Sequence, residues 1–160
     1  MISKRVIVGL IVEQLTEQLQ NLAGVSRAMH ADASDEQSKP EDKYDTRGLE
    51  TAYLASSQAR MATEMEQALA IYQALELKKF LEKTPIDVTA LVELESNGAC
   101  TLHFLGPKGG GLEIHHKGQE ILVITPESPL GQQLLGKKVG DRIKFVTRGP
   151  AQEFRVASVR

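Results

Sequence analysis

The chain has 160 residues, 41% of them hydrophobic and only 4% aromatic, which is enough for one domain or two small ones with a mainly aliphatic core. A net charge of −2 argues against bulk electrostatic binding to nucleic acid, and no sequence-specific DNA binding is expected. Cys100 is the single cysteine, which excludes an internal disulfide, and no stretch approaches the ~20 apolar residues of a membrane span. A cytoplasmic protein without membrane contact is therefore expected.

Two helices are predicted in the N-terminal half. Apolar residues recur at alternating steps of four and three, which is typical of a helix that buries one stripe against another. These positions are Val8, Val12, Leu15, Leu19, Leu22, Ser26 and Met29. A second helix is predicted from about Thr46 to Lys79, with a stripe formed by Ala55, Ala62, Met65, Leu69 and Tyr72. Similar lengths around one short connection predict an antiparallel helical hairpin, a coiled coil, over residues 1–83. A fragment of a plain helical bundle would show the same pattern.

The segment 32–45 is predicted to be an acidic turn between the helices, because serines and a proline interrupt the helical pattern. Its six acidic residues and two lysines give a net charge of −4. Such turns are usually only solvated. At the end of a rod, however, Asp42 and Asp45 are three residues apart and on a helical turn could share one hard cation.

Thr84-Pro85 ends the helical region, because proline disfavours helix at the preceding residue and has no N–H to donate. Over residues 84–160, beginning near Ile86, a period of two predicts strands. They are expected at Val88–Glu95, Ala99–Leu105, Leu112–His116, Glu120–Thr125, Arg142–Thr147 and Glu153–Val159. Asn97-Gly98 and Lys117-Gly118 are tight-turn signals between neighbouring strands.

One short helix is predicted between these strands, from Pro129 to Leu135. Ser128 is its expected N-cap, Pro129 lies in its first turn and Gly136 closes it. The second half is therefore predicted to be a small antiparallel β domain with one helix, and the fold class is α+β.

The remaining motifs favour ordinary structural roles. The glycine-rich segment 106–111 lacks the Gly-Lys-Ser/Thr ending of a phosphate loop and is predicted to be a flexible β loop. His103, His115 and His116 have no cysteine or acidic partner at zinc-site spacing. Cys100 is expected to be a small buried residue. The last 24 residues carry seven basic and two acidic residues, a net charge of +5, which indicates either edge-strand protection or a face for an acidic partner.

The segment from Thr125 to Asp141 resembles the C-terminal signature of the bacterial Gre transcript-cleavage and elongation factors. The resemblance rests on Ser-Pro-Leu-Gly at 128–131, Leu-Leu-Gly-Lys at 134–137 and Val-Gly-Asp at 139–141. It implies an FKBP-like C-terminal domain that docks outside RNA polymerase, and a coiled coil that enters the polymerase's secondary channel. Acidic tip residues would then assist the magnesium-dependent cleavage of backtracked RNA.

The resemblance also implies roles for individual residues. The polymerase-docking residues would be Ser128, Pro129, Leu130, Gly131, Lys137, Lys138 and Arg142. The acids supplied to the polymerase magnesium would be Asp42 and Asp45, with Glu41 next. The protein alone would bind no cofactor and would not be an enzyme, but would stimulate the nuclease activity of the polymerase core and contact nascent RNA indirectly.

The tip departs from the family pattern, in which Asp-x-x-Glu-Asn is closely followed by Ala-Glu-Tyr. Aligning Tyr53 on that tyrosine places Thr46 and Leu49 where the acids should be, and the nearest acidic spacing is Asp42-Lys43-Tyr44-Asp45. The alternative hypothesis is therefore a secondary-channel regulator without cleavage stimulation, such as an inhibitor, a decoy or an anti-pausing factor. An FKBP-like fold also raises prolyl isomerase activity, although this half offers few aromatic residues for such a pocket.

Overall fold

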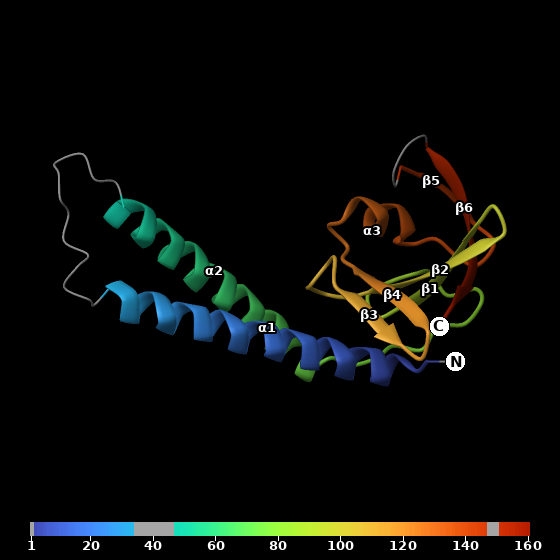
Figure 1. Cartoon of the computed structure of the whole chain (residues 1–160). Helices are drawn as coiled ribbons and strands as arrows, with labels where there is room; N and C mark the ends of the chain where they lie inside the picture. Colours follow the sequence, from blue (N-terminus) through green and yellow to red (C-terminus); the bar gives the residue numbers. More distant parts are fainter. Residues whose placement is uncertain (1, 34–46, 147–150) are drawn as a thin grey trace. The chain divides into compact units, whose positions relative to one another are not determined.

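The computed structural model describes residues 2–33, 47–146 and 151–160, and its contacts divide the chain into two compact units (Figure 1). One unit is Val12–Ala70; the other combines Met1–Ile11 with Ile71–Arg160. The first turns of the first helix and the end of the second thus belong with the β domain. The compact units do not coincide with the predicted boundary between residues 83 and 84.

The unit Val12–Ala70 is a helical hairpin, made from most of α1 (Lys4–Ala33) and α2 (Arg47–Gln73), which run antiparallel in Figure 1. Leu15 of the predicted stripe is buried, as is Ala68 on α2, whose small side chain lets the helices approach. The predicted hairpin is confirmed. The side chains of α2 become more exposed toward its start at Arg47: Ala68 is 5% exposed, whereas Met61 is 44% and Leu54 50% exposed.

The second unit is built on a six-stranded sheet in the order β3-β4-β2-β1-β6-β5. The strands are β1 (Leu91–Ser96), β2 (Ala99–Leu105), β3 (Glu113–His116), β4 (Gln119–Ile124), β5 (Arg142–Phe145) and β6 (Gln152–Val159), with α3 (Pro129–Leu134) between β4 and β5. β2 and β4 are parallel, whereas the other neighbouring pairs are antiparallel. The sheet is therefore mixed: the predicted antiparallel pairing is confirmed for four of the five neighbouring pairs, and β2–β4 is the parallel exception.

Two hairpins form at the predicted turns. Asn97 and Gly98 have φ values of 52° and 78°, and Lys117 and Gly118 have 48° and 77°. Positive φ at both central positions is the geometry of the two-residue turn that matches the twist of paired strands. These residues therefore fix the β1–β2 and β3–β4 registers.

β1 begins at Leu91, later than the predicted Val88, because Thr89 has a φ of 78°. Such backbone is unfavourable for a β-branched residue and must be held by its surroundings. The Thr89 N–H donates to the carbonyl of Leu105 at 2.7 Å, and its hydroxyl accepts from the N–H of Lys78 at 3.0 Å. These two hydrogen bonds hold Thr89 in its positive-φ conformation, so β1 cannot begin before it.

The main core of this unit packs α3 against the sheet. Its centre includes Val92, Leu94, Leu105, Leu134 and Val156. Along β2, Phe104 alternates with Leu105 and is also fully buried, so the sheet buries side chains on both faces. Further buried residues of the unit, outside the α3 core, are Ile2, Ile7, Ile11, Tyr72, Leu91, Ile114, Ile121 and Val123.

Candidate functional site

The predicted docking residues surround α3, whose first turn is fixed by Ser128. The Ser128 hydroxyl accepts from the N–H of Gly131 at 3.1 Å and donates to the carbonyl of Thr125 at 2.7 Å. Pro129 follows at the first helical position, where its missing N–H costs nothing, and its side chain is exposed. The predicted N-cap is confirmed, and it presents Pro129 at the surface in a rigid setting.

Leu130 and Gly131 are part of the interior of the domain. Leu130 is buried in the α3 core, and Gly131 is buried against Thr125. A Cβ atom at position 131 would lie 1.9 Å from the Thr125 carbonyl oxygen, so only glycine fits. These two residues therefore shape the surface around Pro129, and neither presents a side chain for direct docking.

The end of α3 is joined to the segment that precedes β1. Gly136, at a φ of 77°, donates its N–H to the carbonyl of Ile86 at 2.9 Å, and the Ile86 N–H donates to the carbonyl of Lys137 at 2.8 Å. The backbone that carries Lys137 is thus bonded on both sides. Gly136 occupies the left-handed position after the helix end, as its predicted closing role requires.

The turn after Lys137 orients Lys138. The Asp141 carboxylate accepts from the N–H of Lys138 at 2.8 Å, and the Asp141 N–H donates to the Lys138 carbonyl at 3.0 Å. Gly140 in turn donates to the carbonyl of Val156 on β6 at 2.8 Å. Lys138 is exposed and Lys137 is half-buried, and neither forms an ion pair with any described residue. The positive charges of Lys137 and Lys138 are therefore carried by a backbone turn that hydrogen bonds hold in place.

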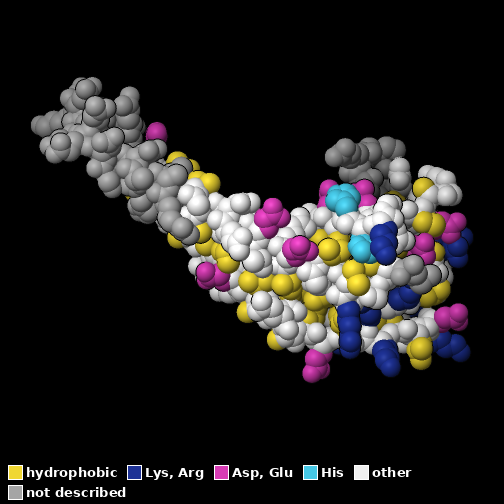
Figure 2. All heavy atoms as spheres, turned by 60° about the horizontal axis from the view of Figure 1, so that its bottom comes forward, with side chains coloured by type: hydrophobic (Ala, Val, Ile, Leu, Met, Phe, Trp, Pro, Cys, Tyr) yellow, Lys and Arg dark blue, Asp and Glu magenta, His cyan; other side chains and the backbone are white. Residues whose placement is uncertain are grey.

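Arg142 differs from these lysines, because its charge is already paired. Its guanidinium contacts the Glu153 carboxylate at 2.7 Å across the β5–β6 pair, and Arg155 likewise pairs with Glu95. Both pairs are solvent-exposed, and such pairs contribute at most about 1 kcal/mol. Lys and Arg side chains still gather over the β domain on the face shown in Figure 2. The positive charge available to a partner lies mainly on the lysines.

The predicted metal-holding acids Glu41, Asp42 and Asp45 lie outside the described residues. α2 begins after them, at Arg47. On its first described turns, Leu49 is 75% exposed and Tyr53 is 78% exposed. Two large apolar residues at a spacing of four on a solvated helix face are a signal of an interaction surface that the sequence itself contains.

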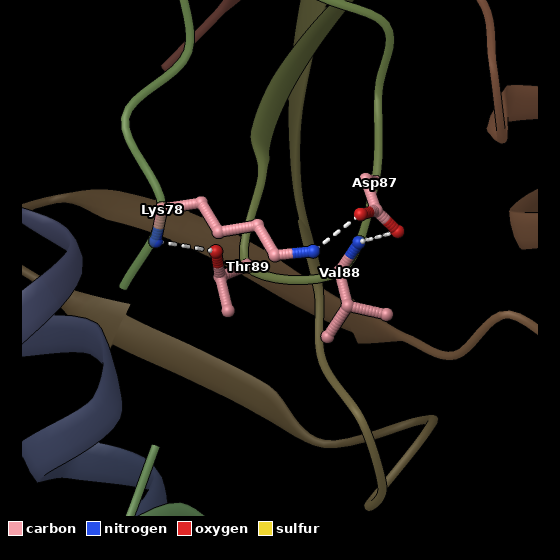
Figure 3. A network of polar contacts seen from close by, with 4 residues as sticks. All are labelled: Lys78, Asp87, Val88 and Thr89. Atoms are coloured by element: carbon pink, nitrogen blue, oxygen red, sulfur yellow. Dashed lines mark hydrogen bonds and ion pairs between the residues drawn. The ribbon is translucent and has the colours of Figure 1, made fainter. Parts of the chain in front are cut away.

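A polar network that the sequence interpretation missed holds the segment after α2 against the β domain (Figure 3). Lys78 donates from its backbone to Thr89, and its ammonium pairs with the Asp87 carboxylate, which also accepts from the N–H of Val88 at 2.8 Å. The hydrogen bond from Lys78 holds the pKa of Asp87 below its ordinary value. This segment includes Lys79, the predicted end of the second helix, so these contacts replace the last predicted helical turns.

Tyr72 explains the glycine-rich segment 106–111, for which the sequence predicts only a flexible β loop. Its hydroxyl donates to the Lys108 carbonyl at 2.6 Å, and a Cβ at Gly106 would lie 2.1 Å from that hydroxyl oxygen. The side chain is 1% exposed, and burial raises the pKa of the Tyr72 phenol. A glycine is therefore needed at position 106 so that the loop can pack closely against Tyr72. The sequence signal for this contact is a tyrosine on the predicted buried stripe of the second helix.

Three histidines and the cysteine lie in the β domain, and each has a separate place there. His103 is buried, its Nε2 lies 3.0 Å from the Thr101 hydroxyl, and burial lowers the pKa of its ring to about 4. His115 and His116 lie on the short strand β3. Within the described ranges no three His, Cys, Asp or Glu side chains come together as metal ligands. Cys100 is exposed, so the expectation of a buried cysteine is wrong; it lies at the β1–β2 hairpin end.

The comparison with protein-family models concerns the β domain. Residues 86–160 match the family model of the C-terminal domain of the transcription elongation factors GreA and GreB. No curated protein sequence matches the chain. In the part of the chain that the structure describes, none of the helices is both long and apolar enough to cross a bilayer.

Several solved structures are similar to this chain. The GreA factor homolog 1 (Gfh1) of Thermus thermophilus is 19% identical, with a TM-score of 0.39, over 93% of this chain and 94% of that one. Gfh1 of Thermus aquaticus is 21% identical, with a TM-score of 0.40, over 92% of each chain. A GreA/GreB elongation factor from Nitrosomonas europaea is 18% identical, with a TM-score of 0.34, over 59% of this chain and 78% of that one.

Proposed function

We propose that this chain is a Gre-like factor that binds core RNA polymerase and acts on transcription elongation, because residues 86–160 match the C-terminal domain of the transcription elongation factors GreA and GreB. The observation that carries this proposal is the family match over residues 86–160, which includes α3 and the turn after it. The chain acts on the polymerase and is not itself an enzyme. RNA polymerase as partner places it in the cytoplasm.

The β domain docks on the outside of the polymerase in this proposal. Pro129 offers a rigid apolar contact at the start of α3, and Lys137 and Lys138 carry exposed or half-buried positive charges after its end. The positive charge of these lysines would raise the rate of association with an acidic polymerase surface. Higher salt would lower that rate, because it screens exposed charges. Arg142 contributes less, since Glu153 already pairs with it.

The helical hairpin enters the secondary channel. With 30 residues in α1 and 27 in α2, the helices are about 45 Å and 40 Å long at 1.5 Å per residue. Asp42 and Asp45, with Glu41 next, would present carboxylate oxygens, the ligands that magnesium prefers. The magnesium belongs to the polymerase, where it stabilises the attacking and leaving oxygens of RNA cleavage. The acids would orient water there, so contact with nascent RNA is indirect.

A second candidate function is a channel-binding regulator that does not stimulate cleavage. One observation favours it: Leu49 occupies a position where the family pattern has an acid, and its exposed side chain has no oxygen to offer a metal ion. Docking tolerates small displacements, whereas catalytic geometry does not. Such a factor would occupy the channel as an inhibitor, a decoy or an anti-pausing factor.

The two functions are separated by adding the purified protein to a stalled, backtracked polymerase complex. A cleavage factor shortens the RNA. A regulator leaves the RNA intact but competes with a genuine cleavage factor for the polymerase. If the protein neither shortens the RNA nor binds core polymerase in anisotropy titrations, the proposed function is wrong.

A further inference from the structure

An exposed apolar patch lies near the start of α2, which follows the acidic segment 32–45 in the sequence. Leu49 and Tyr53 are 75% and 78% exposed, and their spacing of four places them about 40° apart on the same helix face. Further along that face the residues are polar, as in the ion pair of Arg60 with Glu64 at 3.9 Å. Most of the apolar surface of Leu49 and Tyr53 is therefore left uncovered by the packing of the hairpin.

The patch borders a hollow that is large enough to receive side chains of a partner. Its volume is about 450 Å³, and it is lined by Leu49, Glu50, Tyr53 and Leu54. Hydrophobic side chains are visible at the surface of the described part of the hairpin in Figure 2. Grouped exposed apolar residues mark interaction surfaces, and tyrosine is prominent among the residues that dominate binding energy.

The charge around the patch restricts what can cover it. In the sequence, the segment 32–45 with a net charge of −4 precedes α2 by one residue, and Glu50 lies in the lining of the hollow. Phosphates of nucleic acid and anionic lipid headgroups are repelled by such a neighbourhood. Two copies of the chain joined through this patch would bring two Glu50 carboxylates together. An apolar protein surface with a basic rim is favoured by both the side chains and the charges.

We propose that Leu49 and Tyr53 anchor the hairpin on an apolar, basic-rimmed wall inside the polymerase channel. This inference rests on the proposed function, since it takes RNA polymerase as the partner. The anchor supplies affinity at the tip end of the hairpin independently of the lysines on the β domain. It serves a cleavage factor and a non-cleaving regulator equally, because both need the hairpin held in the channel.

The test compares the full-length double variant Leu49→Gln/Tyr53→Gln with the parent. Glutamine keeps a good helix propensity while it removes the apolar surface. Leu81→Gln is the matched control, because Leu81 is also a leucine that is 75% exposed and it lies outside the hairpin. Affinity for core polymerase is measured by fluorescence anisotropy, and unchanged thermal melting shows that each variant is folded. The double variant is expected to bind on the order of tenfold more weakly or worse, and the control within about twofold of the parent.

The outcomes separate the anchor from the proposed function. If the parent binds polymerase and the double variant binds equally well, the function stands and the anchor is wrong. If the parent does not bind at all, the proposed function fails and this proposal fails with it. Sedimentation that shows patch-dependent self-association, or patch-dependent binding of a single-stranded RNA oligonucleotide, would assign the surface to a second copy or to nucleic acid and overturn the inference.

Discussion

Gly131→Ala is the sharpest test of how α3 is held. The added Cβ would lie 1.9 Å from the Thr125 carbonyl oxygen, 2.8 Å from its carbonyl carbon and 2.9 Å from the Ser128 hydroxyl oxygen. Two of these neighbours are backbone atoms, which cannot rotate away as a flexible side chain would. The first turn of α3 must therefore shift, and the bond from the Gly131 N–H to Ser128 is strained or lost.

The expected loss of stability combines three effects. Overpacking in a tight site costs about 1–3 kcal/mol. Loss of the Ser128 cap costs about 1 kcal/mol. The better helix propensity of alanine offsets about 1 kcal/mol. The net destabilisation is about 1–3 kcal/mol, and at roughly 2–4 °C per kcal/mol for a chain of this size the melting temperature falls by about 2–12 °C.

Differential scanning calorimetry of the full chain measures this change, with Gly9→Ala as the matched control. Gly9 lies in α1, in the same compact unit, and a Cβ built there meets no atom within 4 Å other than those of its chain neighbours and its own helix backbone. The same substitution should therefore raise stability at Gly9, by up to about 1 kcal/mol, and lower it at Gly131. A Gly131→Ala protein that melts at or above the parent temperature would refute the close-contact argument.

Three further predictions concern docking, the tip and pH. Changing both Lys137 and Lys138 to glutamate should weaken polymerase binding on the order of tenfold at low salt and less at high salt, because salt screens exposed charges; anisotropy over a salt series measures this, and a salt-independent loss would point to misfolding. Asp42→Asn and Asp45→Asn should each lower RNA cleavage by about an order of magnitude or more while affinity is retained, as expected when a positioned charge is lost; cleavage at the parent rate would place the functional acids elsewhere. Burial lowers the pKa of His103 to about 4. The unfolded chain, with a histidine pKa near 6.5, then binds more protons, so the free energy of unfolding should fall by up to about 3 kcal/mol as pH drops from about 6.5 to 4. Urea unfolding at several pH values should show this fall in the parent and not in His103→Gln.

Local sequence signals predicted most elements of the fold because the physics that forms them is also local. Asn97-Gly98 and Lys117-Gly118 take the positive φ values that two-residue hairpins need. Ser128 caps α3 through its own hydroxyl three residues ahead of Gly131. Each of these structures is decided within a few residues, so the pattern in the sequence is sufficient.

Features that depend on distant partners were not predictable in this way. The parallel pairing of β2 with β4 joins strands that are not consecutive in the chain. Thr89 adopts a positive φ, which its residue type disfavours, and hydrogen bonds to Leu105 and Lys78 hold it there. In the candidate site, the loss of Arg142 as a free charge depends on the β5–β6 register, which brings it near Glu153. Periodicity and turn signals carry no information about such pairings.

The packing of the first turns of α1 with the β domain has a consequence for the order in which the protein assembles. Ile2, Ile7 and Ile11 are buried in the unit whose remaining residues are Ile71–Arg160. At a synthesis rate of about 5–20 residues per second, these isoleucines emerge from the ribosome roughly 8–30 s before the last strand, β6, is complete. Until then they are an uncovered apolar stripe on a growing chain. Nascent chains of this protein should therefore be transient clients of ribosome-associated chaperones, which release them when the sheet closes over the helix start.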